Sequence, residues 1–328
     1  VTVTSTDGKL IEEYPIRVTT DVLTITTKDI SNLVVGKSQQ IETSGGKSPL
    51  TYTSENKSIA TVDENGKVTG KSAGSTTITV KDDLGQTAKV TVTVVAKFTL
   101  SPASGSVIVN GTCQIKANNT IKSYQSKDTS IASVDSKGLV KGLKKGTTTI
   151  TVTDIYGQTA NFTITVNNPT FTLTPSSATI NVGGTYTIKG SNTIKSYKSN
   201  NEAVATVSSS GTITGKSKGK TTITVTDIYG QTANFTITVN NPTFTLNTTT
   251  ITIKGKEQYT IKGSNSIKSC TSNNTKVATV TNTGVITGVA NGTATITVTD
   301  IYGQTATFTV KVNSPAFSVT PSSATINV

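Results

Sequence analysis

The chain has 328 residues and a formal net charge of +12, with 70 Thr and 27 Gly but no His, Met or Trp. Without His, it has no side chain whose unperturbed pKa lies near neutrality and no imidazole ligand, which excludes His-based catalysis and His-ligated metal sites. The abundant Thr favours β-strands, because its branched side chain packs well on a pleated surface. An apolar content of 33% suits small sandwich domains better than one large core.

A repeat of 73 residues dominates the sequence. The string Asp-Ile-Tyr-Gly-Gln-Thr begins at Asp154, Asp227 and Asp300, and a variant of it begins at Asp82. This period is too long for a solenoid unit and matches a small domain with its own core. We therefore expect four complete repeats between two partial ones. In chain order they are 1–21 (the closing part of an incomplete repeat), 22–96, 97–169, 170–242, 243–315 and 316–328 (the start of a further incomplete repeat).

The elements predicted within a repeat are short strands. In the third repeat, apolar residues alternate with Thr, Ser or Lys, and turn residues separate the alternating segments. A period of two predicts seven or eight strands, and no segment has a helical period. The expected fold class is all-β, with each repeat an immunoglobulin-like antiparallel β-sandwich. The expected strands are 171–173, 178–182, 186–188, 194–198, 204–207, 212–214, 221–226 and 234–239.

The Asp-Ile-Tyr-Gly segment is expected to join the last two strands of each repeat. Its Gly stands where a hairpin needs a positive φ, and its Asp can cap the turn through its own carboxylate. Asn-Asn-Pro or Asn-Ser-Pro closes three of the repeats, at 167–169, 240–242 and 313–315. Because these links are short and Pro fixes φ, we expect the domains to be arranged as a rod.

One segment carries a family resemblance. Residues 199–215, Ser-Asn-Asn-Glu-Ala-Val-Ala-Thr-Val-Ser-Ser-Ser-Gly-Thr-Ile-Thr-Gly, resemble the signature of bacterial immunoglobulin-like domains of group 2, and residues 54–70 are similar to it. The resemblance implies a structural or display protein with no catalytic residues and no cofactor. Where the family usually has Trp on its central strand, this chain has Tyr52, Tyr124, Tyr197 and Cys270.

The expected function is that of a non-catalytic extracellular stalk in a bacterial surface adhesin, which spaces or presents a binding tip. A bacteriophage virion protein, such as a tail fibre or a tail or head decoration that attaches to a host surface, is the alternative, and the accessory binding modules of an enzyme are a third possibility. Since both ends of the sequence fall inside a repeat, we expect the chain to be a segment of a longer polypeptide.

The charge of the chain suggests the kind of partner. Its only Arg is Arg17, so the basic surface consists of lysine, whereas the specific reading of bases and phosphates relies on guanidinium groups. We therefore expect no specific nucleic-acid binding. Anionic cell-surface glycans or envelope polymers, or other surface or virion proteins, are the expected partners. No apolar stretch approaches the 18 or so residues of a membrane span, so no membrane insertion is expected in this segment.

Tyr156, Tyr229 and Tyr302 are the candidate contact residues, because each stands at a predicted hairpin tip. They either pack on the preceding interdomain junction, which is the preferred interpretation, or form a recognition loop. The Asp residues of the same turns are expected to be caps and not calcium ligands, because calcium usually takes several carboxylates. Cys113 and Cys270 stand where other repeats have Tyr, at two different positions, and are expected to be small apolar residues without a disulfide.

Overall fold

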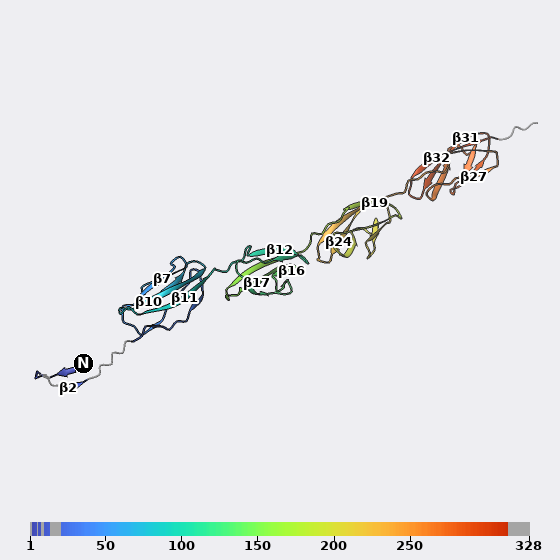
Figure 1. Cartoon of the computed structure of the whole chain (residues 1–328). Helices are drawn as coiled ribbons and strands as arrows, with labels where there is room; N and C mark the ends of the chain where they lie inside the picture. Colours follow the sequence, from blue (N-terminus) through green and yellow to red (C-terminus); the bar gives the residue numbers. More distant parts are fainter. Residues whose placement is uncertain (1, 5, 8–9, 14–20, 314–328) are drawn as a thin grey trace, which may run out of the picture. The chain divides into compact units, whose positions relative to one another are not determined.

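The computed structural model describes residues 2–4, 6–7, 10–13 and 21–313. All regular elements in these ranges are strands, and each set of strands comes from one continuous stretch of sequence (Figure 1). By internal contacts the chain divides into two compact units, Val1–Pro169 and Thr170–Val328. The predicted partial repeat 316–328 lies outside the described residues. Within 1–21, the described strands β1 (Thr2–Thr4) and β2 (Leu10–Glu13) form an antiparallel pair.

The unit Val1–Pro169 contains two β-sandwiches, which we call the first and the second. The first consists of β3 (Thr24–Ile25), β4 (Ile30–Val34), β5 (Ser38–Gln40), β6 (Thr43–Ser44), β7 (Thr51–Ser54), β8 (Ala60–Val62), β9 (Lys67–Gly70), β10 (Gly74–Lys81) and β11 (Thr87–Val95). The second consists of β12 (Ser104–Ile108), β13 (Thr112–Gln114), β14 (Ile121–Ser126), β15 (Ala132–Val134), β16 (Leu139–Gly142), β17 (Gly146–Asp154) and β18 (Thr159–Asn167).

The unit Thr170–Val328 contains the third and fourth sandwiches. The third consists of β19 (Ser177–Asn181), β20 (Thr185–Thr187), β21 (Ile194–Ser199), β22 (Ala205–Val207), β23 (Thr212–Gly215), β24 (Gly219–Asp227) and β25 (Thr232–Asn240). The fourth consists of β26 (Thr250–Ile253), β27 (Gln258–Thr260), β28 (Ile267–Ser272), β29 (Ala278–Val280), β30 (Val285–Gly288), β31 (Gly292–Asp300) and β32 (Thr305–Val312). The predicted all-β immunoglobulin-like class is confirmed.

The same two sheets recur in every sandwich. In the third, one sheet has the order β19-β25-β24-β21 and the other β20-β23-β22. The predicted strand 171–173 contributes only an isolated bridge between Leu173 and Gly190. The first sandwich instead has an additional two-stranded pair, β3 with β6.

The four-stranded sheet differs from the antiparallel expectation in one pair. β19 runs parallel to β25, and the corresponding strands pair in the same way in the other sandwiches. Alternation along a strand reveals its two faces but not its direction, so the sequence pattern does not contain this information. Parallel pairing means that the first and last long strands of a sandwich point the same way. The intervening strands act as the long crossover that a parallel pair requires.

Alternating side chains build the core. Along β24, Ile223 and Val225 are fully buried, while the alternating residues Thr222, Thr224 and Thr226 are half-exposed on the outer face. Phe235 on β25 is fully buried and stacks on Tyr186, with ring centroids 5.3 Å apart. Further members of the third core are Leu173, Ile188, Ala205, Ile213, Ile237 and Val239.

The central-strand Tyr covers a glycine turn. Gly211 has a φ of +81°, and a Cβ there would overlap the ring of Tyr197. Tyr52 and Tyr124 lie in the same way over their own glycine turns. In the fourth sandwich, Cys270 is 5% exposed, and isoleucine side chains are nearest to the corresponding glycine. Cys270 is buried, as expected of a small apolar residue, whereas Cys113 is half-buried.

Candidate linker-anchoring site

A buried Asp opens the turn between the last two strands of every sandwich. Asp154, Asp227 and Asp300 are 0% exposed and Asp82 is 4% exposed. A buried carboxylate is costly unless hydrogen bonds satisfy it. In the fourth sandwich, Oδ1 of Asp300 accepts hydrogen bonds from the backbone N–H groups of Tyr302 at 2.9 Å and Gln304 at 2.7 Å. The predicted capping role and the positive φ of the turn glycine are therefore confirmed.

The second carboxylate oxygen holds two side-chain amides. Oδ2 of Asp300 accepts from Asn265 Nδ2 at 2.8 Å and from Gln304 Nε2 at 3.3 Å. Asn119 makes the same 2.8 Å contact to Asp154. These donors occupy both oxygens of the carboxylate. Within the described residues, no group of three or more His, Cys, Asp or Glu could hold a metal ion.

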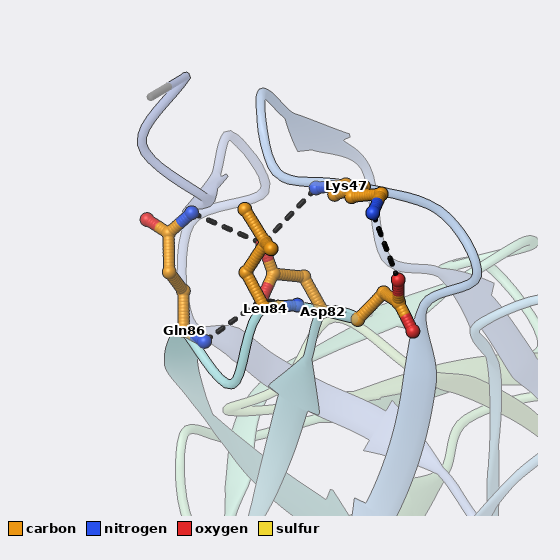
Figure 2. Close-up of polar contacts among 5 residues, drawn as sticks. Lys47, Asp82, Leu84 and Gln86 are labelled. Carbon is orange, nitrogen blue, oxygen red and sulfur yellow. Dashed lines mark hydrogen bonds and ion pairs between the residues drawn. The ribbon is translucent and has the colours of Figure 1, made fainter. Parts of the chain in front are cut away.

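The first sandwich reaches the same arrangement with a different donor. The backbone N–H of Lys47 donates to Oδ2 of Asp82 at 3.0 Å, in the place of the Asn side chain (Figure 2). Leu84 and Gln86 donate to the same carboxylate through their backbone N–H groups. The neighbouring Lys47–Asp83 ion pair, at 3.3 Å, is exposed and therefore adds little stability.

These hydrogen bonds determine the titration of the carboxylate. Burial is the largest single influence on Asp300 and opposes its ionisation. The hydrogen bonds from Asn265, Gln304 and Tyr302 together outweigh burial and hold the pKa of Asp300 below its ordinary value of 3.8. The pKa of Asp227 is lowered by the same balance. Both carboxylates are therefore charged at neutral pH.

The Gln of the turn also binds the segment that enters the sandwich. Gln158 Nε2 donates to the carbonyl of Ala96 at 2.9 Å, and its Oε1 accepts from the backbone N–H of Phe98 at 3.0 Å. In the fourth sandwich, Gln304 Nε2 donates to the carbonyl of Pro242 at 2.6 Å. In the first, Gln86 Nε2 donates to the carbonyl of Asp21 at 3.2 Å.

We call the Asp, the Gln and the supporting amide the linker anchor. Asn265 Nδ2 joins the Gln at the Pro242 carbonyl, at 3.2 Å, so one amide contacts both the linker and the buried carboxylate. The Asp orients the amides, and the amides bind the entering backbone. Sequence reasoning identified only the Asp. The Gln in all four turns, and Asn at 119, 192 and 265, could have revealed the other members.

The three predicted Tyr residues lie beside the anchor, each in a different sandwich. Tyr156 is 42% exposed, and Tyr229 and Tyr302 are half-buried. The described contacts involve their backbone: each N–H donates to the turn Asp, and the carbonyl of Tyr302 accepts from Asn241 Nδ2 at 3.5 Å. Both roles suggested for these side chains, junction packing and recognition, stay predictions.

The comparisons with known proteins identify the family. The model of the bacterial Ig-like domain (group 2) matches residues 94–164, 168–239 and 238–310. The chain belongs to this family. Residues 35–83 match a second model, the immunoglobulin-like domain of intimin. Both are families of structural and adhesion domains found in extracellular or surface-exposed proteins.

A curated relative covers part of this array. Ice-binding protein 1 of Shewanella frigidimarina (strain NCIMB 400) is 26% identical in an alignment of 253 residues that covers 63% of this chain. The aligned region spans 28% of that relative's length. No helix in the part of the chain that the structure describes is long and apolar enough to cross a membrane.

Two solved structures are among those to which this chain is similar. A C-terminal fragment of intimin, in complex with the intimin-binding domain of its translocated receptor, is 22% identical over 47% of this chain and 68% of the fragment, with a TM-score of 0.35. Drosophila N-cadherin EC1-4 is 14% identical over 86% of this chain and 96% of its own, with a TM-score of 0.22.

Proposed function

We propose that this chain is a non-catalytic extracellular stalk of a bacterial surface adhesin, in which the repeats 22–96, 97–169, 170–242 and 243–315 space or present a binding tip. The observation that carries the proposal is the linker anchor. A sandwich that hydrogen-bonds its own entering segment restricts the freedom of the joint, and a stalk requires restricted joints. A flexible linker would have no such contacts along its backbone.

The course of the strands also supports a stalk. Because the first and last long strands of each sandwich run parallel, the chain enters at one end and leaves at the other. A strand such as β24, with nine residues, spans about 30 Å. Each domain added to the array would then increase its reach by roughly 35–40 Å, including the end loops.

The chemistry of the surface supports the proposed partners. The excess of lysine favours loose attraction to anionic glycans or envelope polymers on a cell surface. The matched families are adhesion and structural domains, which supports a role without catalysis. The phage-virion alternative gains no support from the relatives described above, and we do not propose it.

Solution scattering tests the stalk. We expect the 328-residue chain to have a radius of gyration of roughly 40 Å, the value for a thin rod of four domains of about 35–40 Å each. A single compact globule of this length would have a radius of about 20 Å. A value close to that of the globule would contradict the stalk.

Replacing the anchoring glutamine tests the joint. Gln158→Ala removes the acceptor for the backbone N–H of Phe98 and a donor to the carbonyl of Ala96. Loss of a hydrogen bond worth about 1 kcal/mol should speed hydrogen exchange at the Phe98 amide about fivefold, while the second sandwich stays folded. Gln125→Ala removes an exposed glutamine of the same sandwich and serves as the control. Unchanged exchange at Phe98 in Gln158→Ala would show that the anchor does not restrain the linker.

A further inference from the structure

The second sandwich has a polar groove that lies apart from the linker anchor. Its volume is about 450 Å³, and it lies over the last residues of β14 and the outer face of β17 and β18. The outer residues of these strands are polar because their alternate residues form the core. The lining residues are Gln125, Ser126, Lys127, Thr149, Thr151 and Asn161.

Strand register places the lining residues in two rows across the sheet. Gln125 pairs with Thr151, and Thr151 pairs with Asn161, which forms the first row. Lys127 lies beside Thr149 in the second row, and its backbone N–H donates to the Thr149 carbonyl at 2.9 Å. One ammonium group, two side-chain amides and two Thr hydroxyls therefore border the same groove.

In the first sandwich, two side chains on the same face pair with each other. Glu55 and Lys89 stand at the positions of Lys127 and Asn161, and their charged groups are 3.2 Å apart. This ion pair connects Glu55, which follows the edge strand β7, with Lys89 on β11, and so it spans the strand β10 that lies between them. The charges of these two side chains are therefore already paired.

In the third sandwich, the side chains on this face form hydrogen bonds with one another. Asn200 stands at the position of Lys127, and its Nδ2 donates to Thr222 Oγ1 at 2.7 Å. Thr224 Oγ1 is 3.4 Å from Oδ1 of the Asn200 side chain and 3.2 Å from Oδ1 of the Asn234 side chain. These contacts link the edge strand to β24 and β25.

The second sandwich leaves the corresponding groups available. Within the described residues, no carboxylate lies within ion-pair distance of Lys127. The same ranges contain no hydrogen bond from the Gln125 amide or from Nδ2 of Asn161, whose Oδ1 accepts only from Thr151 at 3.3 Å. Residues 148–173 and 221–246 are identical, so the difference from the third sandwich comes from the edge strand, where Gln125 and Lys127 replace Lys198 and Asn200.

We propose that this groove binds an anionic oligosaccharide of the cell envelope, with Lys127 pairing with the negative group. The Gln125 and Asn161 amides and the Thr hydroxyls can donate to and accept from sugar hydroxyls. A hydrogen bond to a charged group is stronger than one between neutral groups, so Lys127 contributes most to affinity. The inference rests on the proposed function, for which it names a site and a ligand class.

Calorimetric titration of the whole chain tests the site by loss of function. The probes are an oligomer of galacturonic acid, poly(glycerol phosphate), and a neutral glucose oligomer of similar length. Lys127→Asn introduces the residue of the third sandwich and should weaken binding of the anionic probe about tenfold, which corresponds to one charged hydrogen bond. Lys198→Asn makes the same charge change on the third sandwich and should change affinity less than about twofold. The better anionic probe identifies carboxylate or phosphate as the natural group.

A gain-of-function variant tests the same inference independently of lost stability. The double substitution Lys198→Gln and Asn200→Lys gives the third sandwich all the residue types that line the groove of the second. We expect the number of bound oligosaccharides per chain to rise from one to two. Equal weakening by Lys127→Asn and Lys198→Asn, binding of the neutral probe alone, or no binding to any probe would overturn the site. The scattering test of the stalk is unaffected by each of these results.

Discussion

Replacing Phe235 by Ala should destabilise the third sandwich by about 3–5 kcal/mol. Phe235 is fully buried, and its ring stacks on Tyr186 with centroids 5.3 Å apart. The substitution loses the burial of a large side chain and leaves a cavity between the two sheets. Because a domain of this size has a free energy of unfolding of only about 5–10 kcal/mol, the loss is a large part of the total.

Hydrogen exchange across β20 and β23 of the full chain measures this effect, because those strands differ in sequence from the corresponding strands of the other sandwiches. Thr236→Ala alters the outer face of the same strand and should change the stability by less than about 0.5 kcal/mol. A double-mutant cycle with Tyr186→Ala should give a coupling of about 0.5–1.5 kcal/mol for the ring pair. A cost below about 1 kcal/mol for Phe235→Ala would mean that this ring does not organise the core.

Asp300→Ala should lower the unfolding temperature of the fourth sandwich by more than about 5 °C. The substitution removes the shared acceptor of four hydrogen bonds, from the backbone N–H groups of Tyr302 and Gln304 and the side-chain amides of Asn265 and Gln304. The two amides keep the Pro242 carbonyl as an acceptor, so the two backbone N–H groups are the donors left without a partner. Buried donors without partners are more costly than the mean value of a hydrogen bond suggests. Calorimetry of the full chain measures the shift, and Glu257→Gln, at an exposed carboxylate of the same sandwich, is the control.

The contribution of Asp300 should also depend on pH. Because its pKa is lower in the folded state than the ordinary value of 3.8, the ionised carboxylate stabilises the folded state. This stability is fully present above about pH 4 and is lost as the pH falls through the lowered pKa. The difference in unfolding temperature between the wild type and Asp300→Asn should therefore shrink in acid. A difference that stays constant from neutral pH to about pH 2 would contradict this role.

Most of the fold, but only part of the linker anchor, could be predicted from the sequence. Alternation of Thr with Ile or Val locates strands such as β24 and β25 to within about two residues, and the turn Gly has the expected positive φ. Strand direction was not accessible, because a period of two is the same in parallel and antiparallel pairs. The antiparallel expectation was therefore wrong for one pair in each sandwich.

The site was harder to predict because its members are distant in sequence. Asn265 and Asp300 are 35 residues apart, and Gln304 reaches a carbonyl 62 residues before it. A local turn motif predicts the contacts made within a few residues of the Asp but cannot reveal partners that tertiary folding brings to it. The Asn and the Gln recur at the same positions in the repeats, which indicates that these positions require them. The recurrence alone does not show what their amides bind.

The linker anchor has a consequence for how such a gene can change. The first, second and fourth copies of the repeat each encode both the sandwich and the groups that hold the segment leading into it, so a duplicated copy of this kind supplies its own joint. The neighbouring copy need not acquire complementary substitutions when a unit is inserted or removed. The identity of residues 148–173 with 221–246 shows that copying has occurred in this chain. We therefore expect that such an array could lengthen or shorten by whole units without a new interface having to evolve at each junction.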